Sequence, residues 1–435
     1  MLPGARLAAV IEILDQIEAS DTAAESILRS YFRSRRYAGS KDRRSVGEHV
    51  YDIFRHRARL DWWIAGASGD MQPDSRKRVM AFLHVLQGMT AEDVSAVFDG
   101  SGHNPPPLSE TEGDLSRNLD GKPLLHDAMP AGVLMEVPEW LTQPLQDLWG
   151  DRFDAEMSAL NAQAPVDLRV NLSRVTLQQA RKALARDGIK TEPCPISPSG
   201  LRLVERARLE DTKPFKQGLV EIQDEGSQLI ALLTDAKPGM TVIDYCAGGG
   251  GKTLALADRM GLQGNAKGRL VACDVSPKRL SGLDPRVTRA GVKSVETFIL
   301  DGKNRLKVSA DRVLVDAPCS GLGAWRRHPE ARWRLTQEKL TNYLETQTSI
   351  LRNAAEYVKP GGRLIYATCS LLPWENESQI DRFLKSHKDF KTLPIADVWE
   401  TTIGEGCPVA CPSLTISPAT TGTDGFFCQV MERKD

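Results

Sequence analysis

Acidic side chains and a cysteine lie at the ends of a series of short apolar segments in the second half of the chain. The segments predict strands over 241–246, 270–275, 295–300, 312–316 and 363–368. The polar residues at their ends are Asp244, Asp274, Asp301, Asp316 and the pair Thr368–Cys369. In a parallel α/β sheet, ligands bind beyond the carboxyl ends of the strands. We therefore expect these side chains to line one crevice.

The first of these strands leads into four consecutive glycines, within Asp-Tyr-Cys-Ala-Gly-Gly-Gly-Gly-Lys-Thr over 244–253. Glycines let the backbone approach a ligand closely, and the amides at a helix start suit an anionic or polar group. A phosphate-binding loop would need glycine where Cys246 stands, and a dinucleotide loop would need glycine in place of Thr253. An acid that ends the strand before a glycine-rich turn suits S-adenosylmethionine best. A turn that binds nothing is the remaining alternative.

Two further acids and two cysteines extend this pattern. Asp274 is placed to accept the ribose hydroxyls, and Asp301 to meet an adenine amino group, although either could be a helix cap or turn acid. Cys319 and Cys369 follow neighbouring predicted strands, and together they suggest covalent catalysis. A thiolate that adds to carbon 6 of a pyrimidine makes carbon 5 nucleophilic enough to attack a methyl sulfonium. Such a reaction needs a cysteine, a carboxyl group at ring nitrogen 3 and a base.

The whole sequence has the composition of a globular protein. The 435 residues are 41% hydrophobic and 26% charged, with a net charge of −1, and they predict two or three domains. No apolar run is long enough to span a membrane, and acids interrupt the N-terminal apolar pattern, so we expect a cytoplasmic protein. The eight cysteines form no Cys-x-x-Cys pair, which argues against a metal site, and Cys407 and Cys411 are interpreted as incidental.

The chain preceding the strands predicts two further domains. Apolar residues at helical spacing predict a helical bundle over 1–130, with Thr90 as a cap for a helix beginning at Ala91 and with 101–130 as a long loop. A small α+β subdomain is predicted over 138–217, with a helix over 139–148, strands over 168–171 and 201–204, and a helix over 177–187. From 218 onward, alternating strands and helices predict a mostly parallel sheet with helices on both faces.

A basic region in the helical domain is a candidate nucleic-acid surface, the alternative being an ordinary solvated helix face. Its members are Arg29, Arg33, Arg35, Arg36, Lys41, Arg43, Arg44, Arg55, Arg57 and Arg59.

Several motifs together resemble the RsmB/NOP family of RNA cytosine-5 methyltransferases, also called the Fmu/Sun or NSUN group. They are Gln-Asp-Glu-Gly-Ser-Gln at 223–228, the loop at 244–253, Asp-Val-Ser-Pro-Lys-Arg-Leu at 274–280, Asp-Ala-Pro-Cys-Ser-Gly-Leu-Gly at 316–323, Arg-Arg-His-Pro-Glu at 326–330, Tyr-Ala-Thr-Cys-Ser at 366–370 and Asp-Gly-Phe-Phe at 424–427. The stretch Leu-Arg-Val-Asn at 168–171 is similar to the family's small RNA-contacting subdomain. The helical N-terminus resembles the NusB-like domain of the RsmB branch.

The resemblance implies a Rossmann-like methyltransferase core over 218–435, a NusB-like RNA-binding domain over 1–130 and a small RNA-binding subdomain over 138–217. It implies Cys369 as nucleophile, Cys319 as the residue that promotes product release, and Asp316 as the group that holds the cytosine. S-adenosylmethionine would be bound by Cys246, Ala247, Gly248, Gly249, Gly250, Gly251, Lys252, Asp274, Asp301 and Asp316. We expect a monomer that acts on structured RNA, most of all small-subunit ribosomal RNA, without metal or membrane.

The sequence departs from the family pattern at two places. Glycines stand where the family often has Ala-Pro-Gly-Gly before the lysine, which predicts a less preorganised loop. Pro285 interrupts the helix that follows Asp274, so that helix should end or kink near Leu283. Transfer RNA as the substrate, an ATPase, and a non-catalytic RNA-binding assembly factor remain the alternatives.

Overall fold

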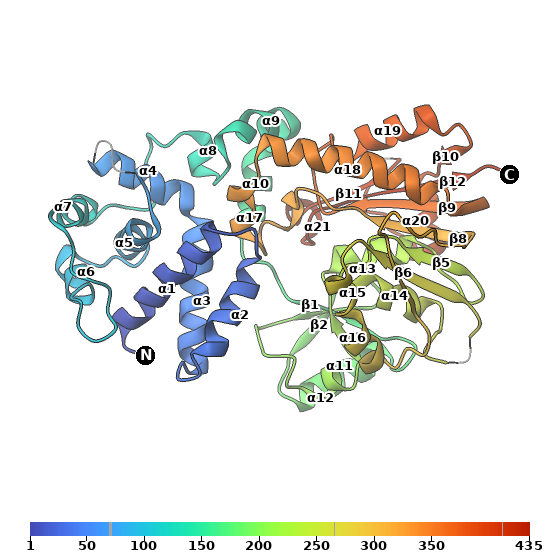
Figure 1. Ribbon diagram of the computed structural model, residues 1–435, viewed down its shortest axis with the longest axis horizontal. Helices are drawn as coiled ribbons and strands as arrows, with labels where there is room; N and C mark the ends of the chain where they lie inside the picture. Colours follow the sequence, from blue (N-terminus) through green and yellow to red (C-terminus); the bar gives the residue numbers. More distant parts are fainter. Residues whose placement is uncertain (69–71, 265, 411) are drawn as a thin grey trace. The chain divides into compact units, whose positions relative to one another are not determined.

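The computed structural model describes residues 1–68, 72–264, 266–410 and 412–435, so Cys411 lies outside the described residues. The chain forms two compact units (Figure 1). One comprises Met1–Ala162 with Trp325–Leu335, and the other comprises Gln163–Ala324 with Thr336–Asp435. None of the described helices is both long and apolar enough to cross a membrane.

The first unit is a helical bundle around one apolar core. In α1, residues at helical spacing such as Val10, Ile13 and Ile17 are fully buried, as the sequence pattern predicts. The predicted cap is confirmed, because the Thr90 hydroxyl accepts a hydrogen bond from the Asp93 backbone N–H. The helices are α1 Pro3–Glu18, α2 Ala24–Ser34, α3 Ser40–Arg55, α4 Arg57–Ser68, α5 Ser75–Val85, α6 Ala91–Val97, α7 Glu110–Leu119, α8 Ala131–Leu134, α9 Glu139–Trp149, α10 Phe153–Asn161 and α17 Pro329–Arg334.

The helix α7 corrects the prediction of one long loop over 101–130. Ser109 and Glu112 form a capping box that starts the helix, and Leu115 and Leu119 are fully buried on its inner face. This cap and apolar spacing outweigh the high content of loop-forming residues around the helix.

The segment containing α17 belongs to the helical unit, although it lies within the residue range predicted for the catalytic domain. The guanidinium of Arg332 is fully buried and donates hydrogen bonds to the Glu136 carbonyl at 3.0 Å and to Asn161 Oδ1 at 3.1 Å. The indole N–H of Trp333 donates to the Phe54 carbonyl at 2.9 Å. These long-range contacts could not be inferred from the segment's place in the sequence.

The second unit begins with a small antiparallel sheet of order β2-β3-β1-β4. Its elements are β1 Asp167–Val170, β2 Thr191–Pro193, β3 Gly200–Leu203, β4 Val220–Ile222, α11 Leu177–Arg186 and α12 Lys213–Lys216. The two strands and the helix predicted between them are confirmed within one residue at each end. The sheet extends to Ile222, beyond the predicted end of the subdomain at 217.

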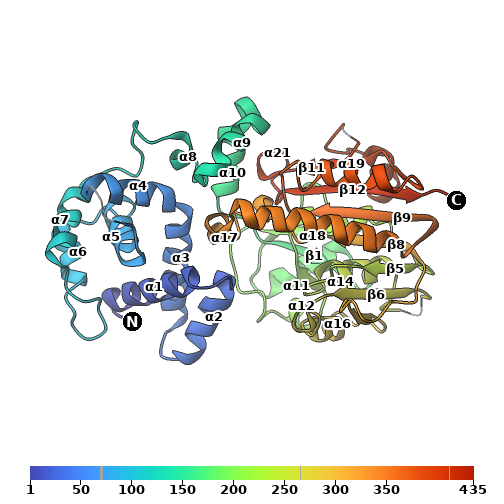
Figure 2. The same cartoon turned by 45° about the horizontal axis from the view of Figure 1, so that its top comes forward.

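The large sheet has the order β10-β12-β9-β8-β5-β6-β7, with β11 paired to β12. Figure 2 shows β9, β8, β5 and β6 side by side, and these strands run parallel, as predicted. An antiparallel strand, β12, joins them at β9. The strands are β5 Thr241–Asp244, β6 Arg269–Asp274, β7 Glu296–Ile299, β8 Ala310–Asp316, β9 Val358–Thr368, β10 Phe390–Thr392, β11 Leu414–Ile416 and β12 Phe426–Arg433.

Alternating side chains of these strands supply two apolar cores on opposite faces of the sheet. Val242 of β5 belongs to the core with α13, α14 and α20, whereas the next residue, Ile243, belongs to the core with α18 and α19. The helices are α13 Glu225–Leu233, α14 Gly251–Arg259, α15 Pro277–Leu280, α16 Leu283–Ala290, α18 Gln337–Ala355, α19 Glu377–Ser386, α20 Ile395–Thr402 and α21 Pro418–Thr421.

The interruption predicted at Pro285 is confirmed. α15 ends at Leu280, and α16 begins at Leu283. Pro285 then lies in the first turn of α16, where the missing N–H removes no intrahelical hydrogen bond.

Candidate active site

Two cysteines lie side by side beyond the carboxyl ends of β8 and β9. Asp316, the last residue of β8, pairs in register with Ala367 of β9, so the loops that follow both strands leave the sheet together. The sulfur atoms of Cys319 and Cys369 are 3.4 Å apart. The hydrogen bond with Cys369, together with burial, raises the pKa of the Cys319 thiol well above its ordinary value. Cys319 is therefore a protonated thiol near neutral pH in this state of the site.

A partly exposed ion pair lies next to the cysteines, with the Lys252 side chain 10% exposed and that of Asp316 30% exposed. The ammonium group of Lys252 is 2.7 Å from Asp316 Oδ2, and it also lies 5.2 Å from the centre of the Phe426 ring. Burial alone would lower the pKa of Lys252, but the charge of the Asp316 carboxylate and its hydrogen bond outweigh this and raise the pKa. The pair therefore places a proton donor and a carboxylate at the same edge of the sheet as the thiols.

The glycine loop between β5 and α14 is tied to the end of β6. Gly250 has a φ of 81°, and a Cβ atom there would lie 2.1 Å from Leu283 Cδ1, so only glycine fits without rearrangement. The backbone N–H of Gly248 donates to Asp274 Oδ2 at 2.9 Å. The other carboxylate oxygen of Asp274 accepts from the Ser276 N–H at 2.8 Å. Asp274 therefore shapes the loop and also faces the cleft described next.

A cleft of about 790 Å³ brings together five of the residues predicted from the sequence. Its walls include Cys246, Asp274, Asp316, Cys319 and Cys369. The expectation of a shared crevice at the strand ends is thus met for Asp274, Asp316 and Cys369, whereas Asp244 and Thr368 are fully buried and do not line the cleft. A volume of this size is in the range of sites for small molecules and cofactors.

Other predicted residues do not line this cleft in the described part of the chain. Residues 247–252 are not among those that line it, although Lys252 contacts Asp316, which does. Asp301 is exposed and accepts hydrogen bonds from the backbone N–H groups of Lys303 and Asn304, at 2.9 and 3.0 Å. The Asp301 carboxylate therefore stabilises a turn in this structure, which is the alternative that the sequence also allowed.

Helix α18 contributes a wall of the cleft that sequence reasoning missed. Thr346, Ser349 and Asn353 lie at helical spacing along it and face the cleft, together with Ile350. The spacing was visible in the sequence, but polar residues at such spacing are also typical of a solvated helix face. Only the fold shows that this face lies opposite the cysteines.

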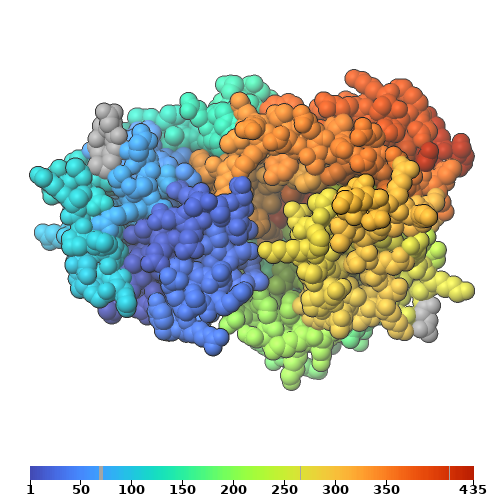
Figure 3. Space-filling view, in the orientation of Figure 1, coloured from blue at the N-terminus to red at the C-terminus, as the bar shows by residue number. Residues whose placement is uncertain are grey.

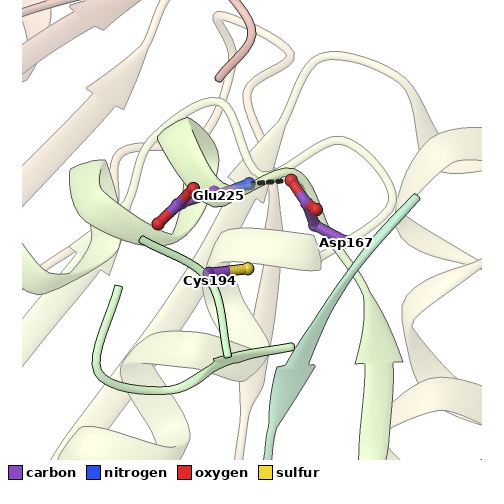
Figure 4. Close-up of side chains that lie close together, drawn as sticks. All are labelled: Asp167, Cys194 and Glu225. Atoms are coloured by element: carbon purple, nitrogen blue, oxygen red, sulfur yellow. Dashed lines mark hydrogen bonds between the residues drawn. The ribbon is translucent and has the colours of Figure 1, made fainter. Parts of the chain in front are cut away.

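One cluster away from the cleft has the residue types of a metal site, in the described part of the chain (Figure 4). Asp167, Cys194 and Glu225 are buried, with potential ligand atoms within 4.8 Å of one another. However, the guanidinium of Arg202 already donates two hydrogen bonds to Asp167, at 2.7 and 3.0 Å. Backbone N–H groups at 196–197 donate to Glu225, and burial raises the pKa of the Cys194 thiol. Arg202 thus supplies the positive charge that a metal ion would bring, so the cluster carries no metal assignment.

The predicted basic region divides into two parts. In the first, Arg29 pairs with Glu25 and Arg35 pairs with Glu12, and three further arginines are structural. Arg55 is buried and donates to the backbone carbonyls of Asn161 and Arg326, at 3.0 and 2.8 Å. The guanidinium of Arg57 pairs with acids of α1 and α4, and that of Arg59 pairs with the buried Glu136. These side chains stabilise the helical unit, and they do not form an open surface.

The other part, here called the α2–α3 basic surface, consists of exposed residues on α2, on α3 and on the loop between them. Helices α1–α3, in blue, contribute to the face shown in Figure 3. Within the described residues, no ion pair involves these cations, and the loop also carries Tyr37, which is 70% exposed. The members of the surface are Arg33, Arg36, Lys41, Arg43 and Arg44.

Comparison with known proteins agrees with the fold. The model of the 16S rRNA methyltransferase RsmB/F family matches residues 231–432, and the model of the RsmF/B-like ferredoxin-like domain matches residues 137–210. A relative from Synechocystis sp., named probable ribosomal RNA small subunit methyltransferase B, is 32% identical over 89% of this chain and 90% of its own length.

Solved structures show the same architecture. The crystal structure of PH0851 is 26% identical, with a TM-score of 0.80 over 100% of this chain and 99% of that one. A methyltransferase homolog protein from Pyrococcus horikoshii is 28% identical, with a TM-score of 0.60 over 72% of this chain and 100% of that one. The similarity to the Synechocystis relative covers nearly the whole of both chains, and residues from four of the motifs, those at 244–253, 274–280, 316–323 and 366–370, line the cleft. The chain belongs to the RsmB/F methyltransferase family.

Proposed function

We propose that this protein transfers a methyl group from S-adenosylmethionine to carbon 5 of a cytosine in small-subunit ribosomal RNA, through a covalent adduct with Cys369. The single observation that carries this proposal is the pair of thiols 3.4 Å apart in a cleft that also contains Asp316. A methyltransferase that acts on an oxygen or a nitrogen needs no such pair. Carbon 5 of a pyrimidine is a poor nucleophile until a thiolate has added to carbon 6.

The relatives support the RNA class. The Synechocystis protein is named for the small ribosomal subunit, and the matching family model is described as a 16S rRNA methyltransferase. The target base must leave its stack to reach the thiols, at a cost of a few kcal/mol. The ferredoxin-like domain and the α2–α3 basic surface are the parts that we assign to RNA contact.

The residues that line the cleft support a nucleoside cofactor. Asp274 is only 4% exposed, and it offers carboxylate oxygens to ribose hydroxyls beside a glycine loop that allows close approach. Val275, which is 67% exposed, and Leu300 provide an apolar lining next to it for a base. When bound, S-adenosylmethionine would supply a methyl group on a positively charged sulfur.

The first half of the proposed reaction forms a bond to Cys369. The thiolate of Cys369 adds to carbon 6 of the cytosine, and ring nitrogen 3 gains a proton. Asp316 holds that nitrogen, and the ammonium of Lys252, 2.7 Å from Asp316, is the proton source. Carbon 5 of the resulting enamine then takes the methyl group.

The second half releases the product. Solvent water takes the proton from carbon 5, the electron pair restores the ring double bond, the bond between carbon 6 and the Cys369 sulfur breaks, and ring nitrogen 3 returns its proton to the Lys252 amine. Cys319, whose sulfur lies 3.4 Å from that of Cys369, promotes this step. Without it, the adduct should persist.

The test is a denaturing gel of protein mixed with labelled S-adenosylmethionine and RNA from cells lacking the protein. Wild type should label RNA, Cys319→Ala should accumulate a protein–RNA adduct, and Cys369→Ala should do neither. Cys407→Ala serves as the matched control, because Cys407 does not line the cleft, and it should behave as wild type.

Each departure from this pattern has a distinct meaning. Labelled RNA without an adduct in Cys319→Ala would contradict the release role of Cys319 alone. Full labelling by Cys369→Ala would contradict the covalent mechanism. No labelling by wild type would favour the non-catalytic RNA-binding factor. Labelling of transfer RNA alone would move the substrate to that class.

A further inference from the structure

A buried glutamate lies directly behind the two cysteines. Glu375 is fully buried in the turn between β9 and α19. Its Oε1 accepts hydrogen bonds from the Ser320 backbone N–H at 2.8 Å and from Gln347 Nε2 at 3.0 Å. Its Oε2 accepts from the hydroxyls of Ser320 and Ser370. One carboxylate thus receives four hydrogen bonds from three different segments of the chain.

Two of these donors are the immediate neighbours of the thiols. Ser320 follows Cys319, and Ser370 follows Cys369, and their hydroxyl oxygens are 3.1 Å apart. Glu375 therefore links the loop after β8 to the loop after β9 at the position where each loop presents its sulfur. No other described carboxylate bonds to both loops.

The surroundings of Glu375 indicate that its carboxylate holds neighbouring segments of the chain in place. No ion pair involving Glu375 occurs in the described part of the chain, and all of its donors are uncharged. A carboxylate without water is stable only when hydrogen bonds satisfy it, so the donors are held firmly around it. Gln347 is itself anchored, because its amide also donates to the Pro318 carbonyl at 3.0 Å.

We propose that Glu375 is a positioning residue, which sets the separation of the two catalytic sulfurs by holding the Ser320 and Ser370 loops together. The proposal rests on the function proposed above for the roles of the cysteines, but the geometry that it concerns can be measured without RNA or methyl donor. A change of about 1 Å in the position of a reacting group can slow a reaction by about 100-fold.

The two oxygens of the Glu375 carboxylate accept from different kinds of donor, so substitution by glutamine and by alanine should have different effects. Oε1 meets two obligate N–H donors, so a glutamine at this position must keep its oxygen there. Its NH₂ group then meets the two serine hydroxyls, which can rotate and accept. Glu375→Gln should therefore preserve the link, whereas Glu375→Ala should abolish it.

The experiment uses disulfide formation as a measure of the sulfur geometry. Diamide takes two electrons from the thiols of Cys319 and Cys369, which lose their protons as the S–S bond forms, and diamide becomes the hydrazine. The rate is followed by mass spectrometry of the linked peptides in the full-length protein. We expect Glu375→Ala to slow this rate by about tenfold or more, and Glu375→Gln to stay within about threefold of wild type.

Glu225→Ala is the matched control, because Glu225 is equally buried in the same unit and accepts hydrogen bonds from the backbone N–H groups of Ile196 and Ser197, which belong to neither cysteine loop. Glu225→Ala should lower the thermal midpoint and leave the rate of disulfide formation unchanged. If Glu375→Ala does not fold, the Ser320→Ala/Ser370→Ala pair should show the loss in rate. In each variant that forms the disulfide more slowly, the maximal single-turnover methylation rate should fall as well. The affinity for S-adenosylmethionine should not change.

Equal disulfide rates in Glu375→Ala and wild type would overturn the proposal, as would an equal slowing by Glu225→Ala. A Glu375→Gln rate as slow as that of Glu375→Ala would overturn the hydrogen-bond geometry on which it depends. None of these results involves methylation, so failure of the proposed function would be recognised separately, by the absence of labelled RNA.

Discussion

Asp244 carries a carboxylate that is completely buried at the end of β5. Its Oδ2 accepts a hydrogen bond from the Thr253 hydroxyl at 2.6 Å, while Oδ1 has no partner among the described residues. Burial raises the pKa of Asp244 from 3.8 to about 7. The folded state therefore keeps a proton on this group between about pH 4 and pH 7, where the unfolded chain has lost it.

The raised pKa of Asp244 predicts that the stability of the protein decreases as the pH rises. The contribution of Asp244 to stability is fully present below about pH 4 and is lost as the pH rises through about 7, by at most about 4 kcal/mol. Asp244→Asn should remove this decline, as measured by the thermal midpoint of wild type and variant across that range. The exposed Asp397, in the same unit, gives the control Asp397→Asn, which should keep the wild-type slope. An unchanged slope in Asp244→Asn would mean that Asp244 is ionised when folded.

The elements that hold the site differ in how well the sequence predicts them. The parallel strands are predicted because each is a short apolar run that ends in a polar residue, which also identifies Asp274, Asp316 and Cys369. Glu375 and the cleft-facing side of α18 have no such signal, since their roles depend on contacts between distant segments. The pairing of Lys252 with Asp316 was missed for the same reason: 64 residues separate them.

The loop from β5 to α14 allows a test at the scale of the element. Gly250→Ala should place a side chain at φ 81° and against Leu283, which costs about 1–3 kcal/mol and displaces the loop from Asp274. Gly239→Ala is the matched control, because Gly239 has a φ of 87° in an exposed turn with nothing near its Cβ position. Both variants should lower the thermal midpoint, but only Gly250→Ala should weaken S-adenosylmethionine binding measured by calorimetry. Equal cofactor affinity in both would contradict the role of the glycine loop in binding.

At the scale of the whole molecule, the near-zero net charge of −1 means that RNA attraction must come from local surfaces. Sequence alone predicted one continuous basic region from Arg29 to Arg59. The structure separates it, because a buried guanidinium such as that of Arg55 is committed to backbone carbonyls, whereas Arg36 and Arg44 remain exposed. Burial decides which cations are available, and residue counts along the sequence do not contain that information.

The α2–α3 basic surface should therefore contribute to RNA affinity in a way that depends on salt. Removing two of its cations in Arg36→Gln/Arg44→Gln should weaken binding at low salt and reduce the slope of log affinity against log salt by roughly one unit for each phosphate that the variant no longer neutralises. Lys385→Gln/Lys388→Gln removes two exposed cations near α19 and is the control for net charge. The maximal methylation rate at saturating RNA should not change in either variant, because neither site lies in the cleft. Equal salt slopes in the two double variants would show that the protein's overall charge, and not the α2–α3 basic surface, determines RNA affinity.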